Sequence, residues 1–247
     1  MHPNRVVLVT GGARRIGARI VEHLHARGAD VAIHYRRSST EAEALAARLN
    51  ERRPDSARAF GADLSTAAAC TRLVEAAGDW HGRLDALVNN ASTFLRTPVG
   101  SIDEALWAEL VDGNLKATLF TSQAAVPWLR AQRGAIVNLS DARVERPLPG
   151  FGVYAAAKAG VVALTRTLAL ELAPRIRVNA VAPGSLDWPE HEVFTEAERR
   201  SIEAAIPLGR IGSGDDIARA VAFLLDGNDY VTGHVLHVDG GSSLVSR

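Results

Sequence analysis

The stretch Val6-Val-Leu-Val-Thr10-Gly11-Gly12-Ala-Arg-Arg-Ile-Gly17 decides the fold of this chain. Val6–Thr10 is a run of mostly β-branched apolar residues, which predicts a buried strand. The glycines predict a tight turn, and Arg15–Arg27 carries apolar residues at helical spacing. A strand, a glycine-rich turn and a helix N-terminus together present backbone N–H groups to an anion such as a pyrophosphate. An ordinary tight turn is the alternative, and the elements around it decide between the two.

Short apolar strands alternate with amphipathic helices along the rest of the chain. The predicted strands are Val6–Thr10, Asp30–Tyr35, Ala57–Gly61, Ala86–Asn89, Ala135–Ser140, Arg177–Val181 and His234–Val238. The predicted helices are Arg15–Arg27, Thr40–Arg52, Ala67–Ala77, Ile102–Arg130, Tyr154–Leu172 and Asp215–Leu225. Because apolar strands separated by helices form parallel sheets covered on both faces, the pattern predicts an α/β fold. No linker or low-complexity tract interrupts it, so we expect a single domain over residues 1–247.

One segment departs from this alternation. Gly184–Leu208 is long and rich in proline and glutamate. An excursion of this size beyond a sheet strand predicts a substrate loop, and a plain connection is the alternative.

Composition excludes several classes of function. The 247 residues include 28 basic and 28 acidic side chains, so no net charge attracts nucleic acid or an anionic membrane. Cys70 is the only cysteine, which rules out an internal disulfide and a cysteine-based zinc site. The first apolar run, Val6–Val9, is too short for a signal peptide or a membrane span, so we expect a cytoplasmic protein. Among the basic residues, only Lys116 and Lys158 are lysines.

The residues after the second strand indicate which dinucleotide the glycine-rich turn would hold. Enzymes that prefer NAD place an Asp or Glu here to bind the ribose 2′-hydroxyl. The segment Ile33-His34-Tyr35-Arg36-Arg37-Ser38 contains two adjacent arginines, and no acid lies between Val31 and Thr40. Because guanidinium groups bind a 2′-phosphate well, we expect NADPH rather than NADH. A solvated turn is the alternative.

Tyr154, Lys158 and Asp141 carry the predicted chemistry. Tyr154 and Lys158 are four residues apart on a predicted helix, so both project from one face. A phenol with a pKa near 10 transfers protons poorly unless a cation favours the phenolate, and Lys158 is that cation. Asp141 follows the strand Ala135–Ser140, and ligands bind beyond the carboxyl ends of such strands. We therefore expect Asp141 and Tyr154 to meet in that crevice.

A set of motifs recurs in one order along the chain: Thr10-Gly11-x-x-x-Arg15-x-Gly17, Asn89-Asn90-Ala91, Asn114, Tyr154-x-x-x-Lys158, Pro183-Gly184 and Val238-Asp239-Gly240-Gly241. With this set the chain resembles the short-chain dehydrogenase/reductase family over essentially its whole length. The resemblance implies a Rossmann-type, doubly wound sheet of seven parallel strands with three helices on each face. It also implies a homotetramer that makes contacts through the helices around Ile102–Arg130 and Tyr154–Leu172.

Two departures from the general family pattern point to the pteridine reductase branch. Arg15 stands where the middle glycine of the turn is usual, and Asp141 stands where a catalytic serine is usual. The other segments similar to that branch are His34-Tyr35-x-Arg37-Ser38, Asn90-Ala91-Ser92-Thr93-Phe94, Ser140-Asp141 through Pro147-x-x-Gly150 to Tyr154, and Trp188-Pro189-Glu190. A serine hydroxyl suits a carbonyl substrate. A dihydropterin instead reacts at a C=N bond, where a proton must reach a ring nitrogen as hydride arrives at the adjacent carbon.

The branch resemblance implies roles for individual residues. Asp141 and Tyr154 act together as the acid pair. Lys158 binds the nicotinamide ribose and tunes the tyrosine, while Asn114 holds water for a proton relay. The pterin stacks between the nicotinamide and Phe94. The residues implied to bind substrate are Arg15, Ser92, Phe94, Asp141, Tyr154 and Trp188. The residues implied to bind cofactor are Gly11, Arg14, Arg15, Ile16, His34, Tyr35, Arg36, Arg37, Ser38, Asp63, Leu64, Asn90, Ala91, Ser92, Tyr154, Lys158, Pro183, Gly184 and Ser185. Which of the two adjacent arginines holds the 2′-phosphate stays open.

Each of the singled-out residues also has a purely structural interpretation. Asp141 suits a turn or cap position, and Phe94 suits an ordinary core. Asn114 suits a helix surface. Arg15 suits a solvated first turn, although a cation at a helix N-terminus is disfavoured unless an anion is present.

The sequence therefore predicts an NADPH-dependent pteridine reductase that converts a dihydropterin, and also an oxidised pterin or dihydrofolate, to the tetrahydro form. The alternatives are a carbonyl reductase acting on a 3-oxoacyl thioester or keto-sugar, and a nucleotide-binding scaffold or redox sensor without chemistry. We expect no metal, because the pairs His23/His25 and His234/His237 each point to different faces of their element. The expected partner is a small-molecule substrate, not nucleic acid or a membrane.

Overall fold

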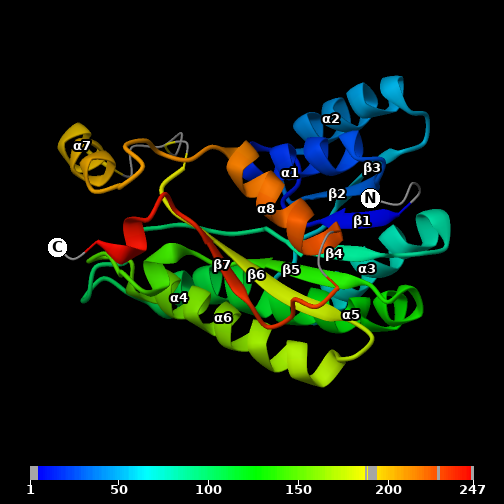
Figure 1. The fold of residues 1–247 in the computed structure, drawn as a ribbon. Coiled ribbons are helices and arrows are strands. Elements are labelled where there is room, and N and C mark those ends of the chain that lie inside the picture. Colours follow the sequence, from blue (N-terminus) through cyan, green and yellow to red (C-terminus); the bar gives the residue numbers. More distant parts are fainter. Residues whose placement is uncertain (1–4, 187, 189–193, 227–228, 246–247) are drawn as a thin grey trace.

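Seven strands form one parallel sheet in a computed structural model that describes residues 5–186, 188, 194–226 and 229–245 (Figure 1). The strands are β1 (Val6–Val9), β2 (Asp30–Tyr35), β3 (Ala57–Gly61), β4 (Ala86–Asn89), β5 (Ala135–Leu139), β6 (Arg177–Pro183) and β7 (Val235–Val238). Their order across the sheet is β3-β2-β1-β4-β5-β6-β7. The predicted strands are confirmed to within two residues at each end.

Helices cover both faces of the sheet. On one face lie α1 (Arg15–Ala26), α2 (Ser39–Arg52) and α8 (Gly214–Asp226). On the other lie α3 (Ala67–His81), α5 (Ala117–Gln132) and α6 (Gly152–Leu172). Successive residues of a strand point to opposite faces, so Val7 and Val9 pack in the first core while Val6 and Leu8 pack in the second. The doubly wound seven-stranded fold with three helices on each face is confirmed.

The predicted helix Ile102–Arg130 is interrupted by a different helical geometry. It consists of α4 (Glu104–Val111), a π-helical turn (Asp112–Lys116) and α5. A π-turn accommodates an extra residue and occurs most often at functional sites. Asn114 lies in this turn and is fully buried, so its interpretation as a helix-surface amide is wrong.

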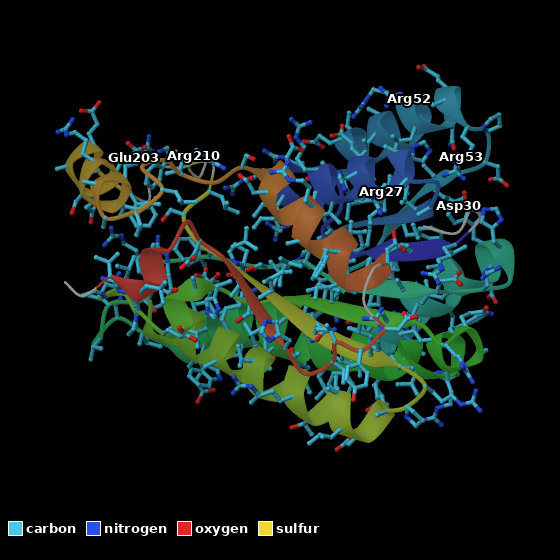
Figure 2. The ribbon with its side chains drawn as sticks, in the orientation of Figure 1. Arg27, Asp30, Arg52, Arg53, Glu203 and Arg210 are labelled. Carbon is cyan, nitrogen blue, oxygen red and sulfur yellow. The ribbon has the colours of Figure 1, made fainter. Side chains whose placement is uncertain are left out.

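The excursion predicted over Gly184–Leu208 contains a short helix, α7 (Glu196–Ala204). It begins at a capping box in which Thr195 and Glu198 bond to each other's backbone N–H. The helix lies apart from both layers, and Figure 2 shows Glu203 there, at the opposite end of the molecule from Asp30. Residues 187 and 189–193 of the excursion lie outside the described residues, including Pro189 and Glu190 of the motif Trp188-Pro189-Glu190.

α6 is long and apolar enough to cross a membrane by length and composition alone. In the fold it is a core helix, because Leu168 and Leu172 pack in the second core against β6 residues such as Val178. It also carries Tyr154 and Lys158, both buried.

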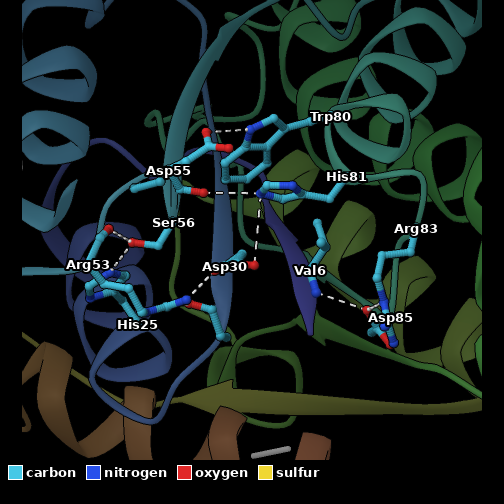
Figure 3. Close-up of polar contacts among 12 residues, drawn as sticks. Val6, His25, Asp30, Arg53, Asp55, Ser56, Trp80, His81, Arg83 and Asp85 are labelled. Atoms are coloured by element: carbon cyan, nitrogen blue, oxygen red, sulfur yellow. Dashed lines mark hydrogen bonds and ion pairs between the residues drawn. The ribbon is translucent and has the colours of Figure 1, made fainter. Parts of the chain in front are cut away.

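Polar contacts join the elements at the amino end of the sheet (Figure 3). Asp30 at the start of β2 pairs with Arg53, which follows α2. Asp85 accepts the backbone N–H of Val6 at 2.9 Å and so ties the start of β1 to the segment before β4. These contacts lie far from the carboxyl ends of the strands, so that edge is left for a ligand.

Candidate active site

A cavity of about 510 Å³ lies at the carboxyl ends of β1, β4, β5 and β6. The predicted site residues that line it are Gly11, Arg14, Arg15, Ile16, Asn90, Ala91, Ser92, Phe94, Asp141, Tyr154, Lys158, Pro183, Gly184, Ser185 and Trp188. The predicted residues that do not line it are His34, Tyr35, Arg36, Arg37, Ser38, Asp63, Leu64 and Asn114. The topology therefore brings together the glycine-rich turn, the segment after β4, the Tyr154/Lys158 pair and the turn after β6.

The glycine-rich turn is held by hydrogen bonds between the ends of β1 and β4. The Thr10 hydroxyl accepts the backbone N–H groups of Asn90 and Ala91 at 2.9 and 3.0 Å. In return the Asn90 amide donates to the carbonyls of Thr10 and Gly11 at 2.9 and 3.0 Å. Gly17 lets α1 approach this turn, because a Cβ there would lie 2.0 Å from the Gly11 carbonyl oxygen.

The turn and α1 fit the pyrophosphate of a dinucleotide. Arg14, at the N-cap of α1, accepts no side-chain capping bond, and the first turn contains no acidic residue. The first backbone N–H groups and the positive end of the helix dipole are thus available to an anion beside the cavity. Arg15 adds a positive charge and has a φ of 51°, a left-handed conformation that costs energy for a residue with a Cβ.

His34 positions this turn. The Gly11 N–H donates to Nδ1 of His34 at 3.0 Å, and Nε2 lies 3.1 Å from the Ala62 carbonyl oxygen. Only the neutral ring with its proton on Nε2 satisfies both contacts. Burial lowers the pKa of His34 and favours the same form. The protein therefore occupies both ring nitrogens of His34, and the predicted contact of this residue with the cofactor stays a prediction.

The two arginines after β2 have different surroundings. Arg36 donates to the Asp63 carboxylate at 3.0 Å, so these two predicted cofactor residues bind each other. Arg37 is exposed and has no hydrogen bond or ion pair among the described residues. The Leu64 side chain packs in the second core. Arg37 is thus the arginine that can bind a phosphate without first breaking an ion pair.

Asp141 and Tyr154 meet as the sequence predicts. The Tyr154 hydroxyl donates to Oδ2 of Asp141 at 2.7 Å, and the backbone N–H of Arg143 donates to Oδ1 at 2.8 Å. Asp141 is therefore both the cap of the short turn Ala142–Val144 and the partner of the tyrosine. Burial raises the pKa of the carboxyl group. Burial, followed by the charge of Asp141, raises the pKa of Tyr154 well above its usual value. The pair therefore retains a proton.

Lys158 differs from its predicted electrostatic role. We expected its charge to favour the tyrosine phenolate, but the pKa of Tyr154 is raised, because burial and the neighbouring carboxylate dominate. The ammonium group donates to the Leu139 carbonyl at 2.8 Å and lies 5.8 Å from the centre of the tyrosine ring. Burial lowers the pKa of Lys158 to about 8, so it is still mostly charged near neutral pH.

Asn114 does not line the cavity but binds Ser92, which does. Its amide nitrogen donates to the carbonyls of Thr93 and Leu110, and its oxygen accepts the Ser92 hydroxyl at 2.6 Å. Ser92, placed beside Tyr154 in this way, lowers the pKa of the phenol. Both amide hydrogens of Asn114 are thus used by the protein. This arrangement makes Asn114 a positioning residue for Ser92, and its predicted role in holding a water molecule stays a prediction.

An aromatic cluster forms one wall of the cavity. Phe94 stacks on Phe151 with ring centres 4.6 Å apart and an angle of 9° between the planes. Tyr154 meets Phe94 edge-on, and Trp188 meets Phe194 edge-on. Phe151 covers one face of Phe94, so a flat ligand can stack only on the other.

Arg143 and Phe194 line the cavity although sequence reasoning did not select them. Arg143 donates to the Ser185 hydroxyl at 3.4 Å, and its positive charge lowers the pKa of both Asp141 and Tyr154. Its guanidinium carbon lies 5.6 Å from the ring centre of Phe194. The one available signal for Arg143 was its place two residues after Asp141, in the turn that Asp141 caps. For Phe194 it was an aromatic residue inside the excursion.

No group of three or more His, Cys, Asp or Glu side chains that would suit a metal ion occurs in the part of the chain that the structure describes. The donors of the cavity are instead hydroxyl, carboxyl and cationic groups, which suit proton transfer and the binding of an anionic cofactor.

Comparison with known proteins identifies the family. The family model described as enoyl-(acyl carrier protein) reductase matches residues 11–243. The chain belongs to the short-chain dehydrogenase/reductase family. It is 39% identical to pteridine reductase 1 of Leishmania tarentolae, over 97% of this chain and 96% of that protein. It is 37% identical to a 3-oxoacyl-(acyl-carrier-protein) reductase of Staphylococcus aureus, over 98% and 99%. It is 39% identical to 3beta-hydroxysteroid dehydrogenase 1 of Eggerthella lenta, over 97% and 94%.

Family membership makes the protein an oxidoreductase that uses a nicotinamide cofactor. The three relatives act on different substrates at almost equal identity, so similarity alone does not select a substrate. The choice of substrate therefore has to come from the geometry of the cavity.

His34 makes stability depend on pH. Its folded-state pKa lies below the unfolded value of about 6.5, so the unfolded chain binds more protons in the acid range. We expect the free energy of unfolding to fall as pH drops below about 6.5, and to fall less steeply in His34→Gln. Urea unfolding of both proteins between pH 5 and 8 measures the difference. Equal pH slopes would contradict the role given to His34.

Proposed function

We propose that the protein is an NADPH-dependent pteridine reductase that reduces a dihydropterin, and also an oxidised pterin or dihydrofolate, to the tetrahydro form. The observation that supports this most is the 2.7 Å hydrogen bond between Tyr154 and Asp141. It pairs a phenol with a carboxyl group at the position where the general family pattern has serine. Two acids in contact suit delivery of a proton to a ring nitrogen.

Tyr154 and Asp141 both take part in the proposed proton transfer. The reduced nicotinamide, when bound, supplies the hydride. Tyr154 and Asp141 hold the proton that a substrate nitrogen needs, since burial raises the pKa of both groups. After the proton leaves, the positive charge of Arg143 stabilises the negative charge left on the pair. Asn114 holds Ser92, which lowers the pKa of the phenol.

The cavity wall suits a flat heterocycle. Phe151 stacks on one face of Phe94, and Phe94, Trp188 and Phe194 all line the cavity. A pterin stacked there would lie between Phe94 and the cofactor, next to the acid pair.

The preference for NADPH is supported by the end of β2. No acidic residue lies between Val31 and Thr40, and Arg37 has no ion-pair partner among the described residues. Arg36 is engaged by Asp63 at 3.0 Å. We therefore assign the 2′-phosphate of the cofactor to Arg37.

Assembly into a homotetramer stays a prediction. It is supported by large apolar side chains exposed on the helices expected to make contacts, such as Trp107 on α4 and Leu170 on α6. The cytoplasmic location stays a prediction as well.

The substrate is tested by following NADPH oxidation with dihydrobiopterin, dihydromonapterin and dihydrofolate. We expect turnover with at least one of them. A panel of 3-oxoacyl thioesters and keto-sugars serves as comparison. Activity on the carbonyl compounds but on no pterin would establish the carbonyl reductase instead. Tight NADPH binding without turnover of either class would establish a scaffold.

The acid pair is tested by Tyr154→Phe and Asp141→Asn, which keep the shape of each side chain. Loss of a general acid costs about 10²- to 10⁴-fold in rate, so we expect kcat with dihydropterin to fall by that factor in each variant. The dissociation constant for NADPH should change only a few-fold. Tyr230→Phe is the matched control, because Tyr230 is fully exposed. Rates like those of the wild type in either variant would refute the pair.

The cofactor preference is tested by Arg37→Ala with Arg36→Ala as the matched control. Loss of a charged hydrogen bond costs about 1.5–3 kcal/mol, so KM for NADPH should rise about 10- to 100-fold in Arg37→Ala. KM for NADH should hardly change, and Arg36→Ala should have the smaller effect on NADPH. A larger effect of Arg36→Ala would reverse the assignment.

A further inference from the structure

The turn of residues 141–146, referred to as the Asp141 turn, presents the carboxyl group of the acid pair to Tyr154. Its internal hydrogen bonds give it its shape. The backbone N–H groups of Val144 and Glu145 each donate to the carbonyl three residues earlier, at 3.1 and 3.2 Å. Bonds of this kind fix the shape of the turn but not its place relative to Tyr154.

A second cavity of about 560 Å³ lies on one side of the Asp141 turn. Ala142, Arg143 and Arg146 of the turn line this cavity, and so do Ser242 and Ser243. A cavity supplies no packing atoms to the groups that line it. On this side the turn therefore depends on side-chain contacts at the border of the cavity.

One such contact joins the Asp141 turn to the residues after β7. The partly buried guanidinium group of Arg146 donates to the backbone carbonyl of Ser242. Nε2 of His237, on β7, lies 3.3 Å from the Glu145 carboxylate, but the side chain of Glu145 is 58% exposed. An exposed ion pair contributes little, whereas a hydrogen bond shielded from water is stronger. Arg146 is therefore the main link between the turn and this segment.

The carbonyl that accepts this hydrogen bond lies in a well-held segment. The Asp239 carboxylate accepts the backbone N–H groups of Gly241 and Ser243 at 2.9 and 2.7 Å, and the Ser242 hydroxyl at 3.2 Å. Asp239 directly follows β7 and lies close to Gly184, which directly follows β6. A Cβ on Gly184 would lie only 2.6 Å from the Asp239 Cα. The Ser242 carbonyl is thus fixed to the carboxyl ends of β6 and β7.

Tyr154 is positioned by a different set of contacts. It lies in the first turn of α6, and the ammonium group of Lys158, one turn later, donates to the Leu139 carbonyl at 2.8 Å. The Ser140 hydroxyl donates to the Lys158 carbonyl at 3.3 Å. The two groups of the acid pair are therefore attached to different parts of the fold, and the distance between them depends on both attachments.

We propose that Arg146 is a positioning residue for proton transfer, because it holds the Asp141 turn so that the Asp141 carboxyl group stays within hydrogen-bond reach of Tyr154. The inference rests on the acid pair of the proposed function. Catalytic groups have to lie within about 0.5 Å of their productive positions, and a displacement of about 1 Å costs about 10²-fold in rate. Without the bond from Arg146, the turn can relax toward the second cavity and take the carboxyl group with it.

The kinetic test compares Arg146→Ala with Arg130→Ala, a matched control at an exposed arginine in the last turn of α5. We expect kcat to fall about tenfold or more in Arg146→Ala and to stay unchanged in the control. KM for NADPH should hardly change, because the glycine-rich turn and Arg37 follow β1 and β2, away from the Ser242 carbonyl. Arg146→Lys keeps a charged donor and should recover part of kcat. Equal kcat in Arg146→Ala and the control would overturn the inference.

The pH profile of kcat distinguishes positioning from a general loss of stability. Burial raises the pKa of Tyr154 and lowers that of Lys158, while the charge of Asp141 raises both. Arg143 lowers the pKa of Tyr154. Both pKa values fall when the carboxylate moves away, so the basic limb of the profile should shift to lower pH in Arg146→Ala. A reduced kcat with an unmoved basic limb would show a purely structural role and overturn the inference.

A crystal structure of Arg146→Ala with bound NADP tests the inference without a substrate. We expect the Tyr154 hydroxyl and the Asp141 carboxylate to lie beyond hydrogen-bond distance, and a contact still at 2.7 Å would overturn the inference. If Arg146→Ala does not fold, Arg146→Lys and Asp239→Asn take its place with the same expectations. Asp239→Asn weakens the bonds that hold the segment of the Ser242 carbonyl.

The outcomes separate this inference from the proposed function. Reduction of dihydropterins at equal kcat in wild type and Arg146→Ala would overturn the role of Arg146 and leave the pteridine reductase standing. Reduction of carbonyl compounds alone would overturn the pteridine reductase, and the same kinetic comparison with the carbonyl substrate would then decide the role of Arg146. If neither class is reduced, the proposed function falls and the crystal structure decides the role of Arg146.

Discussion

The hydrogen bonds between Thr10 and Asn90 are the constraint on which the site depends. They join the ends of β1 and β4, the two neighbouring strands between which the order of the sheet reverses. On one side they fix the glycine-rich turn and hence the start of α1. On the other they fix the segment after β4, which carries Ser92 and Phe94 into the cavity. A ligand in a doubly wound sheet binds where the strand order reverses. Thr10 and Asn90 therefore position the glycine-rich turn relative to the segment that carries Ser92 and Phe94.

The sequence predicted the parts of the site that backbone topology determines. Asp141 lies just after β5 and Tyr154 lies in the first turn of α6, so the order of strand and helix brings them to the same edge of the sheet. The sequence could not predict how tertiary partners divide the hydrogen bonds. The side-chain amide of Asn114 is bound by Thr93, Leu110 and Ser92, which the sequence did not predict, and its role in holding water stays a prediction. His34 is bound by Gly11 and Ala62, and Arg36 is bound by Asp63, whereas their predicted contacts with the cofactor stay a prediction.

Lys158 shows why spacing alone misjudges electrostatics. Four residues along a helix place its side chain on the face of Tyr154, and a cation in water would favour a phenolate there. Inside the fold the loss of solvent outweighs that attraction and shifts both groups toward their neutral forms. The carboxylate of Asp141, 13 residues before Tyr154 in the sequence, raises the pKa of the tyrosine further. Burial is a property of the whole fold, and no local pattern contains it.

The same balance explains why a carboxyl group is useful where serine is usual. A serine hydroxyl can pass a proton only if another group replaces it at once. Burial raises the pKa of Asp141, which makes its carboxyl group easier to protonate, and its Oδ2 accepts the Tyr154 hydroxyl at 2.7 Å. The pair is then a proton donor beside the cavity. The positive charges of Arg143 and Lys158 stabilise the negative charge of the Asp141 carboxylate. Reduction of a C=N bond needs a proton donor of this kind, because the nitrogen has to gain a proton as hydride reaches the adjacent carbon.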